Sequence, residues 1–311
     1  MVPALHLFKS LSDETRLRLL YVLNRYELNV NELVRFLGMG QSRVSRHLKI
    51  LSDAGLLESR RDGLWVFYSV PKEGRGRVFT DAVLPFLAEA ESAEGDMAMA
   101  RGIIDERTRK TSQFFNSIAD DWDNMSREIL GDLDFEDKIL ERVPSPCRMA
   151  VDLGCGTGHM LERLLDRAEQ VIGVDGSASM LELARRRLGA SRPKDEGRIS
   201  LRIGDLAHLP LADGEVDFVC INLVLHHLSA PGEVLREVGR VLKPEGTLVL
   251  SDFNKHEDEK MRLEYGDRWL GFPLENLREF LSKAGFNLSE ASLAPVRKNL
   301  SIHFITATNK N

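Results

Sequence analysis

Residues 151–158 read Val-Asp-Leu-Gly-Cys-Gly-Thr-Gly, and this stretch decides the fold. The apolar run before it predicts a buried strand. The glycines at 154, 156 and 158 let the backbone turn sharply and pass close to a ligand. A strand that ends in such a turn and continues into a helix is typical of nucleotide-binding α/β domains. We therefore expect Gly154, Gly156 and Gly158 to form a cofactor loop.

Strands and helices alternate on both sides of this loop. Such alternation predicts a mainly parallel sheet covered by helices on both faces. The expected strands are 148–153, 170–175, 199–204, 216–221 and 246–252, and the expected helices are 158–167, 177–188 and 231–242. Two last runs, 288–293 and 300–308, predict a closing antiparallel hairpin at the C-terminus.

Polar residues follow the ends of the expected strands. Asp175 lies 21 residues after Gly154, where a carboxylate can accept hydrogen bonds from two ribose hydroxyls. The next strand ends at Gly204-Asp205-Leu206, and the one after it ends at Asn222. A dinucleotide-binding dehydrogenase would show the spacing GxGxxG, whereas this chain has DxGxGxG. The spacing therefore indicates a different nucleotide-containing cofactor.

The pattern DxGxGxG, with VLHHL at 224–228 and RVLKPEGTLVLSDF at 240–253, resembles the class I S-adenosylmethionine (SAM)-dependent methyltransferases. Among these it is most similar to the ubiquinone/menaquinone-type methyltransferases, and the resemblance covers about residues 112–311. It implies a Rossmann-like domain that binds SAM as methyl donor and releases S-adenosylhomocysteine (SAH).

The resemblance assigns part of the cofactor to each strand end. It implies that Asp152 holds the glycine loop and the amino group of the methionyl moiety, with Asn222 near the same end. It implies that Asp175, followed by Gly176, binds the ribose. The adenine side is assigned to Met180, Gly204, Asp205 and Leu206.

Residues 114–123, Phe-Phe-Asn-Ser-Ile-Ala-Asp-Asp-Trp-Asp, resemble the helix that closes over SAM in these relatives. Phe115 and Trp122 are spaced i, i+7, so they would share one helix face. An aromatic ring there can attract the sulfonium cation. The other interpretation is that this face only packs in the core.

His226 and His227 follow the fourth strand, at the edge where the methyl group should point. Histidine is suited to proton transfer near neutral pH, so either residue is a candidate catalytic base. The alternative is a structural or substrate-shaping role. Residues 253–271, with Tyr265 and Trp269, form either a lid that selects the acceptor or a solvated helix. Nothing in the sequence identifies the methyl acceptor.

The N-terminal region has a different pattern. Residues 4–54 predict four short helices, of which the fourth begins near Gln41 and ends at Ala54-Gly55. Its apolar positions would face inward, whereas its other face suits a DNA major groove; that face comprises Gln41, Ser42, Arg43, Ser45, Arg46 and Lys49. Asp62-Gly63 predicts a hairpin turn. Arg60 and Arg61 beside it are placed to contact phosphates. The alternative is an ordinary exposed polar face.

Residues 7–70 resemble the ArsR-type winged-helix repressors, through SLSDETRLRLLYVL, SRVSRHLKILSDAGLL and RRDGLWVFYSV. The resemblance implies binding to double-stranded operator DNA as a homodimer that pairs through the first and last helices, here about 4–10 and 76–90. The third helix has no cysteine and the last helix no histidine, so the metal sites of sensing members are not expected. We expect no metal site in this chain.

Composition agrees with a two-domain protein. Residues 1–80 carry 13 Lys+Arg and 8 Asp+Glu, whereas the remaining residues carry 29 and 40, so a basic end adjoins an acidic body. We expect a DNA-binding and dimerisation domain at 1–92, a helical linker at 93–112 and the methyltransferase domain at 113–311. Three isolated cysteines, no long apolar run and an early charged N-terminus favour a cytoplasmic protein without a membrane span.

These features predict a DNA-binding transcription regulator that also transfers methyl from SAM to a small molecule. The alternative is a regulator without catalysis, which senses SAM or SAH through the methyltransferase-like domain.

Overall fold

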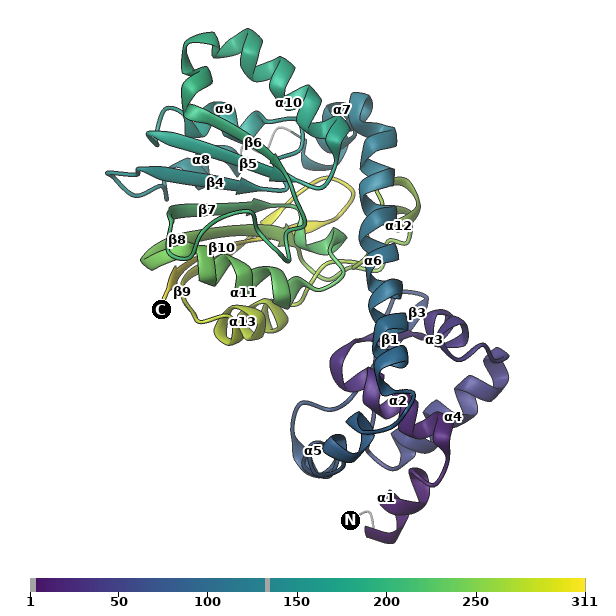
Figure 1. Ribbon diagram of the computed structural model, residues 1–311. Coiled ribbons are helices and arrows are strands. Elements are labelled where there is room, and N and C mark those ends of the chain that lie inside the picture. The colour runs from purple at the N-terminus through teal and green to yellow at the C-terminus, as the bar shows by residue number, and fades with distance from the viewer. Residues whose placement is uncertain (1–3, 132–134, 311) are drawn as a thin grey trace. The chain divides into compact units, whose positions relative to one another are not determined.

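A computed structural model describes residues 4–131 and 135–310. The chain divides into two compact units, residues 1–107 and 108–311. In Figure 1 the first unit is drawn in purple and blue and the second runs from teal to yellow. Among the helices of the described ranges, none is long and apolar enough to cross a membrane.

The first unit contains the four expected helices, a hairpin and a fifth helix. Its helices are α1 (Ala4–Ser10), α2 (Glu14–Arg25), α3 (Val30–Leu37), α4 (Gln41–Asp53) and α5 (Gly74–Ala88). Its strands β1 (Leu28–Asn29), β2 (Glu58–Asp62) and β3 (Trp65–Ser69) form an antiparallel sheet in the order β1-β3-β2. Polar caps set where two helices begin: Asp13 accepts from the Arg16 amide, and Asn29 forms a capping box with Glu32.

Helix α6 (Ala93–Ile118) is longer than the expected linker, and the division between the units falls within it. Ala100 and Ile103 are buried in the core of the first unit. The Arg107 guanidinium pairs with the Glu32 carboxylate there, and both side chains are almost fully covered. Residues 93–107 are therefore a packed part of the first unit.

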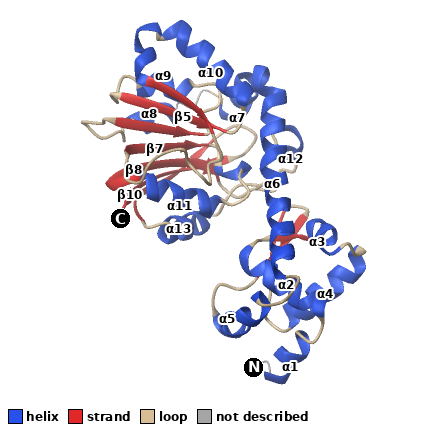
Figure 2. Cartoon of the chain, viewed as in Figure 1, coloured by secondary structure: helices blue, strands red, loops and turns tan. Residues whose placement is uncertain are grey.

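The second unit is built on a seven-stranded sheet (Figure 2). The strands are β4 (Met149–Leu153), β5 (Gln170–Asp175), β6 (Ile199–Ile203), β7 (Val216–Asn222), β8 (Leu242–Phe253), β9 (Phe286–Pro295) and β10 (Ser301–Asn309), in the order β6-β5-β4-β7-β8-β10-β9. The first five of that order are parallel, whereas β10 is antiparallel to β8 and to β9. This confirms the expected mainly parallel sheet and its closing hairpin.

Helices cover both faces of this sheet. One face packs against α11 (Pro231–Val241) and α13 (Leu274–Lys283), and the other against α8 (Phe135–Leu140), α9 (His159–Leu164) and α10 (Ala178–Ser191). Shorter elements are the 3-10 turns η1 (Ala119–Asp121), η2 (Pro193–Arg198) and η3 (Leu225–His227), and the helices α7 (Trp122–Leu130) and α12 (Lys260–Glu264).

The strand order reverses between β4 and β7, because β5 continues to one side of β4 and β8 to the other side of β7. In open α/β sheets, ligands bind outside the carboxyl ends of the strands at this switch point. The glycine loop follows β4 and the histidine pair follows β7, so the fold brings the two predicted sites to the same edge.

Candidate functional site

The glycine loop has the conformation that its sequence requires. Gly154, Gly156 and Gly158 have φ angles of 71°, 50° and 85°, a region that other residues rarely adopt. A Cβ atom on Gly154 would lie 2.4 Å from a methyl carbon of Val224. The loop is therefore packed against the segment that follows β7. A side chain at position 154 would push that segment away from the loop.

Two carboxyl groups adjoin this loop: Asp152 precedes it in β4, and Asp175 ends the neighbouring strand β5. Asp175 Oδ2 accepts from the Gly156 amide at 2.9 Å, and Oδ1 accepts from the Ser177 amide at 2.8 Å. Burial raises the pKa of Asp175. Asp152 is 3% exposed, and burial raises its pKa to about 7, although the hydrogen bond from the Cys220 thiol opposes this. A buried carboxyl group is costly to ionise unless a hydrogen-bond donor or a positive charge lies beside it. Hydroxyl and ammonium groups of a ligand would be such partners for both carboxyls.

The residues expected near adenine differ in exposure. Met180 and Leu206 are buried. The Gly204 amide donates to the Asp175 carbonyl at 3.1 Å. The Asp205 side chain is half exposed and accepts from the Ala207 amide at 3.0 Å. The Asp205 side chain is therefore accessible to a ligand, whereas the Met180 side chain is packed in the interior.

Two further predicted positions, Gly176 and Asn222, are fixed by contacts with other elements of the second unit. A Cβ atom on Gly176 would lie 3.1 Å from Ser112 Oγ, so α6 passes closely over this residue. Asn222, at the end of β7, accepts a hydrogen bond from the Ser251 hydroxyl. Both lie at the carboxyl edge of the sheet, where the sequence placed them.

Phe115 and Trp122 do not belong to one helix, contrary to expectation. Helix α6 ends at Ile118, and α7 begins at Trp122 after the turn η1. Their rings nevertheless meet, with centroids 5.2 Å apart, and Phe115 also meets the His227 ring at 4.7 Å. Trp122 Nε1 lies 3.8 Å from where a Cβ on Gly156 would be. The two aromatics therefore lie between the glycine loop and the histidine pair.

Asp123 is a residue that the sequence reasoning missed. Its carboxylate accepts from Thr157 Oγ1 at 2.6 Å and from the Arg187 guanidinium, and lies 3.3 Å from His159 Nε2. The contact with His159, with those of Thr157 and Arg187, holds the pKa of Asp123 well below its usual range. This cluster fastens α7 to the glycine loop.

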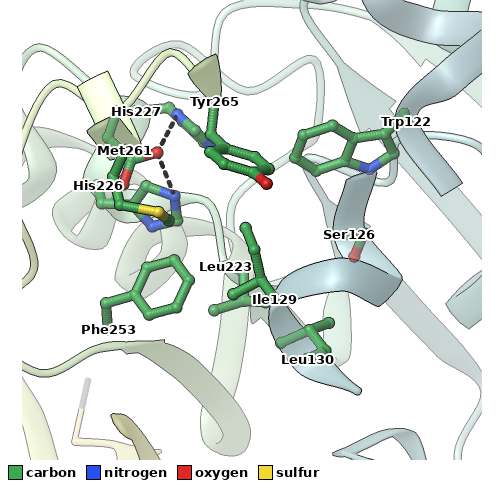
Figure 3. Close-up of a pocket in the computed structure, with 11 residues that line it drawn as sticks. Trp122, Ser126, Ile129, Leu130, Leu223, His226, His227, Phe253, Met261 and Tyr265 are labelled. Atoms are coloured by element: carbon green, nitrogen blue, oxygen red, sulfur yellow. Dashed lines mark ion pairs between the residues drawn. The ribbon is translucent and has the colours of Figure 1, made fainter. Parts of the chain in front are cut away.

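Trp122, which faces the glycine loop, also lines a pocket (Figure 3). The space within it, part of which is open solvent, is about 300 Å³. Most of its wall is apolar: Trp122, Ile129, Leu130, Leu223, Phe253, Met261 and Tyr265, with Ser126, His226, His227 and Asp267 as polar members. Leu223 has a φ of 57°, a strained value for a leucine that is a common feature of functional sites.

His226 is oriented by a buried carboxylate. Its Nδ1 lies 2.9 Å from Asp252 Oδ1, and that oxygen also accepts from the Phe253 amide at 2.8 Å. Burial alone would lower the pKa of His226, but the charges of Asp252 and Asp267 outweigh it and raise the pKa. Burial and the neighbouring His226 hold the pKa of His227 well below its usual range.

Asp267 completes this polar end of the pocket. Its Oδ1 lies 3.6 Å from His226 Nε2 and 3.9 Å from His227 Nδ1, and burial raises its pKa to about 7 although His226 opposes this. Asp252 and Asp267 were not predicted. Tyr265, predicted as a possible lid residue, is buried in the pocket wall, whereas the Trp269 indole donates to the Leu228 carbonyl at 2.8 Å.

In the first unit, α4 has the two faces that its sequence indicated. Val44, Leu48 and Leu51 are buried. The opposite face is exposed: Gln41, Ser42, Arg43, Ser45, Arg46 and Lys49. Lys49 lies 3.2 Å from the Asp53 carboxylate.

The two arginines of the hairpin differ in their surroundings. Arg61 is exposed and its Nε donates to the Gly63 carbonyl at 3.1 Å. Arg60 instead forms two hydrogen bonds to Glu27 and lies over the Phe67 ring at 4.8 Å. Arg60 is therefore held within the domain, and Arg61 is the hairpin residue with a more accessible side chain.

Comparisons with known proteins agree with both halves of this description. The family model of the arsR-family bacterial regulatory proteins matches residues 13–59, and a methyltransferase-domain model matches residues 151–250. A demethylmenaquinone methyltransferase of Symbiobacterium thermophilum is 32% identical over 190 residues, which are 58% of this chain and 73% of that protein. The chain belongs to the SAM-dependent methyltransferase family that includes these enzymes.

Other similarities cover less or show only the fold. An uncharacterized 37.1 kDa protein in a transposon of Streptomyces fradiae is 37% identical over 110 residues, 34% of this chain and 30% of that protein. The solved structure of the [4+2]-cyclase SpnF superposes with a TM-score of 0.57 at 19% identity, over 65% of this chain and 96% of that one. A geranyl diphosphate methyltransferase in complex with SAM gives a TM-score of 0.50 at 14% identity, over 56% of this chain and 84% of that one.

SAM is accordingly the cofactor of this methyltransferase. The residues present suit it, because the loop leaves no room for a side chain at 154 and two buried carboxyls flank it.

Proposed function

We propose that the chain is a DNA-binding transcription regulator whose second unit transfers a methyl group from SAM to an apolar small molecule. The observation that carries the enzymatic part is the pocket beside the glycine loop, with an apolar wall and the His226–His227–Asp267 group at one end. Binding sites for small molecules typically combine such walls with a few convergent polar groups.

In this proposal the predicted positions hold SAM around the glycine loop. Asp175 and Gly176 bind the ribose, Asp152 and Asn222 the methionyl end, and Gly204, Asp205 and Leu206 the adenine. SAM supplies an electrophilic methyl group on a sulfonium. Phe115 and Trp122 separate that group from water and orient the acceptor, because alignment of the two reactants lowers the barrier to transfer.

His226 and His227 contact the ionisable group of the acceptor. Asp252 fixes the tautomer of His226 by accepting at Nδ1, so the lone pair of Nε2 is directed toward the pocket. A lone pair there can take a proton or bind a cation. Two of the relatives are demethylmenaquinone methyltransferases by name, and an apolar acceptor with an ionisable hydroxyl is the class that this pocket suits.

The first unit would bind double-stranded DNA as a homodimer. Charge and exposure support α4 as the groove-contacting helix and Arg61 as a phosphate contact. Helices α1 and α5 expose large apolar side chains, with Leu5, Phe8, Val78 and Phe86 each more than 60% exposed. Such a patch is unusual on a monomer and supports pairing through these two helices.

The test uses the full chain and a DNA fragment from its own promoter. Arg46→Ala should abolish specific binding and leave SAM affinity unchanged. Arg25→Ala, which removes the same charge from the exposed end of α2, should retain specific binding. Equal DNA affinity of Arg46→Ala and the wild type would refute the assignment of α4.

The enzymatic part is tested with SAM labelled in its methyl group and a set of lipophilic phenols and quinols. We expect label in an organic-extractable product with the wild type, and none with His226→Gln. The control His6→Gln changes a histidine in the other unit and should retain transfer. No labelled product from any acceptor or cell extract would leave SAM sensing as the better function.

SAM or SAH sensing is the second candidate, and α6 favours it. This helix contributes Arg107 to the core of the first unit and Asn116 to the start of α10 beside Asp175. A ligand that shifts Asn116 would act on a helix that is also part of the DNA-binding unit.

A further inference from the structure

The polar end of the pocket is a compact group of three possible metal ligands. His226, His227 and Asp267 each offer one ligand atom, and these atoms lie within 4.8 Å of one another. Their side chains are 3%, 6% and 1% exposed. Figure 3 draws the two contacts from the carboxylate to the rings as dashed lines.

Within the described part of the chain, Asp267 lacks hydrogen bonds to its carboxylate oxygens, although the charges of His226 and Arg262 act on it. Both of its carboxylate oxygens are buried without a hydrogen-bond partner among the described residues. Its contacts with the two rings, at 3.6 and 3.9 Å, are too long for hydrogen bonds. Burying a carboxylate without hydrogen bonds costs free energy. A cation or hydrogen-bond donor between these atoms would remove that cost.

The spacing fits a transition-metal ion. Two ligand atoms that each lie about 2.1 Å from a tetrahedral ion are about 3.4 Å apart. The contacts of Asp267 with the two rings, at 3.6 and 3.9 Å, are close to this spacing, and the two histidine ligand atoms, which lie within 4.8 Å of each other, would move together when the ion binds. An ammonium or a water molecule could also enter, but two imidazoles and one carboxylate form a ligand set that catalytic zinc sites use.

His226 already has the support that a metal-binding histidine needs. Asp252 lies 2.9 Å from Nδ1 and is itself held by the amides of Phe253 and His226. A carboxylate on the far nitrogen fixes the ring and makes the ligating nitrogen more basic. His227 Nδ1 also lies 3.3 Å from the Gly266 carbonyl, a weak contact that binding would replace.

We propose that His226 Nε2, His227 Nδ1 and the Asp267 carboxylate bind a divalent zinc-class ion at the end of the acceptor pocket. All three residues line the pocket, so the remaining coordination position faces the acceptor. The ion would bind an acceptor hydroxyl and favour loss of its proton to solvent, because a bound cation increases the acidity of an oxygen. His226 is then a ligand and not the base. This role rests on the proposed methyl transfer, but binding of the ion does not.

The experiment measures metal binding without any acceptor. Full-length protein is treated with a chelator, dialysed and titrated with Co²⁺, whose visible absorption reports coordination by protein ligands, and Zn²⁺ is added in competition. We expect one Co²⁺ per chain, displaced by Zn²⁺, and a higher Tm with either ion. SAM binding, measured on the same samples, shows that each protein is folded.

Variants assign the ligands. Asp267→Asn and His227→Gln should each weaken Co²⁺ binding by at least 100-fold, and Asp252→Asn by about 10- to 100-fold because it acts through His226. Glu257→Gln and His6→Gln make the same chemical changes at exposed positions and should bind as the wild type does.

Two results would overturn the proposal. One is a wild-type protein that binds SAM but shows neither Co²⁺ absorption nor a Zn²⁺-dependent Tm. The other is unchanged Co²⁺ binding by Asp267→Asn. Stoichiometric metal binding without methyl transfer to any acceptor would instead retain the site and reject the proposed enzymatic function.

Discussion

At the scale of single residues, Asp175 is the best-defined of the proposed cofactor contacts. Its two oxygens accept from the amides of Gly156 and Ser177, so the carboxylate is held at the mouth of the glycine loop. Asp175→Ala should weaken SAM binding by about 1.5–3 kcal/mol, the usual cost of losing a hydrogen-bond partner that is charged. Calorimetric titration measures this. Glu169→Ala, at the exposed residue just before the start of β5, is the control, and an unchanged dissociation constant for Asp175→Ala would reject the ribose assignment.

Because Asp152 is proposed to hold the methionyl end of SAM, we expect SAM binding to depend on pH. Burial raises the pKa of Asp152 to about 7, so at lower pH the carboxyl is neutral and cannot pair with the ammonium group of SAM. The SAM dissociation constant should therefore fall as the pH rises from about 5.5 to 7. Asp152→Asn should bind more weakly at pH 7 and lose most of this dependence. The same pH slope in the wild type and in Asp152→Asn would show that another group is responsible.

At the scale of elements, the contact between α7 and the glycine loop depends on one carboxylate. Asp123 binds Thr157, Arg187 and His159, and Trp122 beside it faces the loop. Asp123→Ala should lower SAM affinity about 10- to 150-fold, since a lost charged hydrogen bond costs about 1.5–3 kcal/mol. Asp120→Ala, on the exposed side of the same turn, should have no effect. Calorimetric titration of both variants with SAM tests this. Equal losses of SAM affinity in the two variants would indicate a general effect of charge.

The elements that were predicted correctly are those whose sequence pattern lies within a short stretch of the chain. The glycines at 154, 156 and 158, the apolar runs of β4 and β5 and the two faces of α4 can each be recognised within about ten residues. The break between α6 and α7 was missed because the i, i+7 spacing of Phe115 and Trp122 also suits one continuous helix. Here the end of α6 and the start of α7 bring the rings together across the turn η1.

The missed site residues depend on contacts between distant segments. Asp252 and Asp267 lie on different segments from His226, and only the pairing of β7 with β8 and the loop after α12 brings them to the histidine pair. Arg60 was assigned to DNA because of its place beside the turn. Its pairing with Glu27 depends on how the sheet packs, which the local sequence does not reveal.

At the scale of the whole molecule, helix α6 is common to the two units by sequence. Its residues 93–107 belong to the core of the first unit, and Asn116 accepts from Ser177 Oγ at 2.7 Å and from the Ser179 amide at 3.1 Å in the second. Coupling requires a ligand with different affinities for the DNA-bound and free states, and it acts equally in both directions. A shared helix is the element through which such a difference can arise.

This coupling can be measured by titrating SAM and SAH into the full chain, alone and saturated with its promoter DNA at fixed salt. We expect DNA to shift the dissociation constant of at least one ligand about 5-fold or more, which corresponds to a coupling free energy of about 1 kcal/mol. Asn116→Ala should reduce the shift, because it disconnects α6 from α10, while Arg46→Ala should remove it by preventing DNA binding. Equal affinities with and without DNA would mean that the two units act independently. The winged helix would then bring the methyltransferase to a promoter without reporting on its ligand.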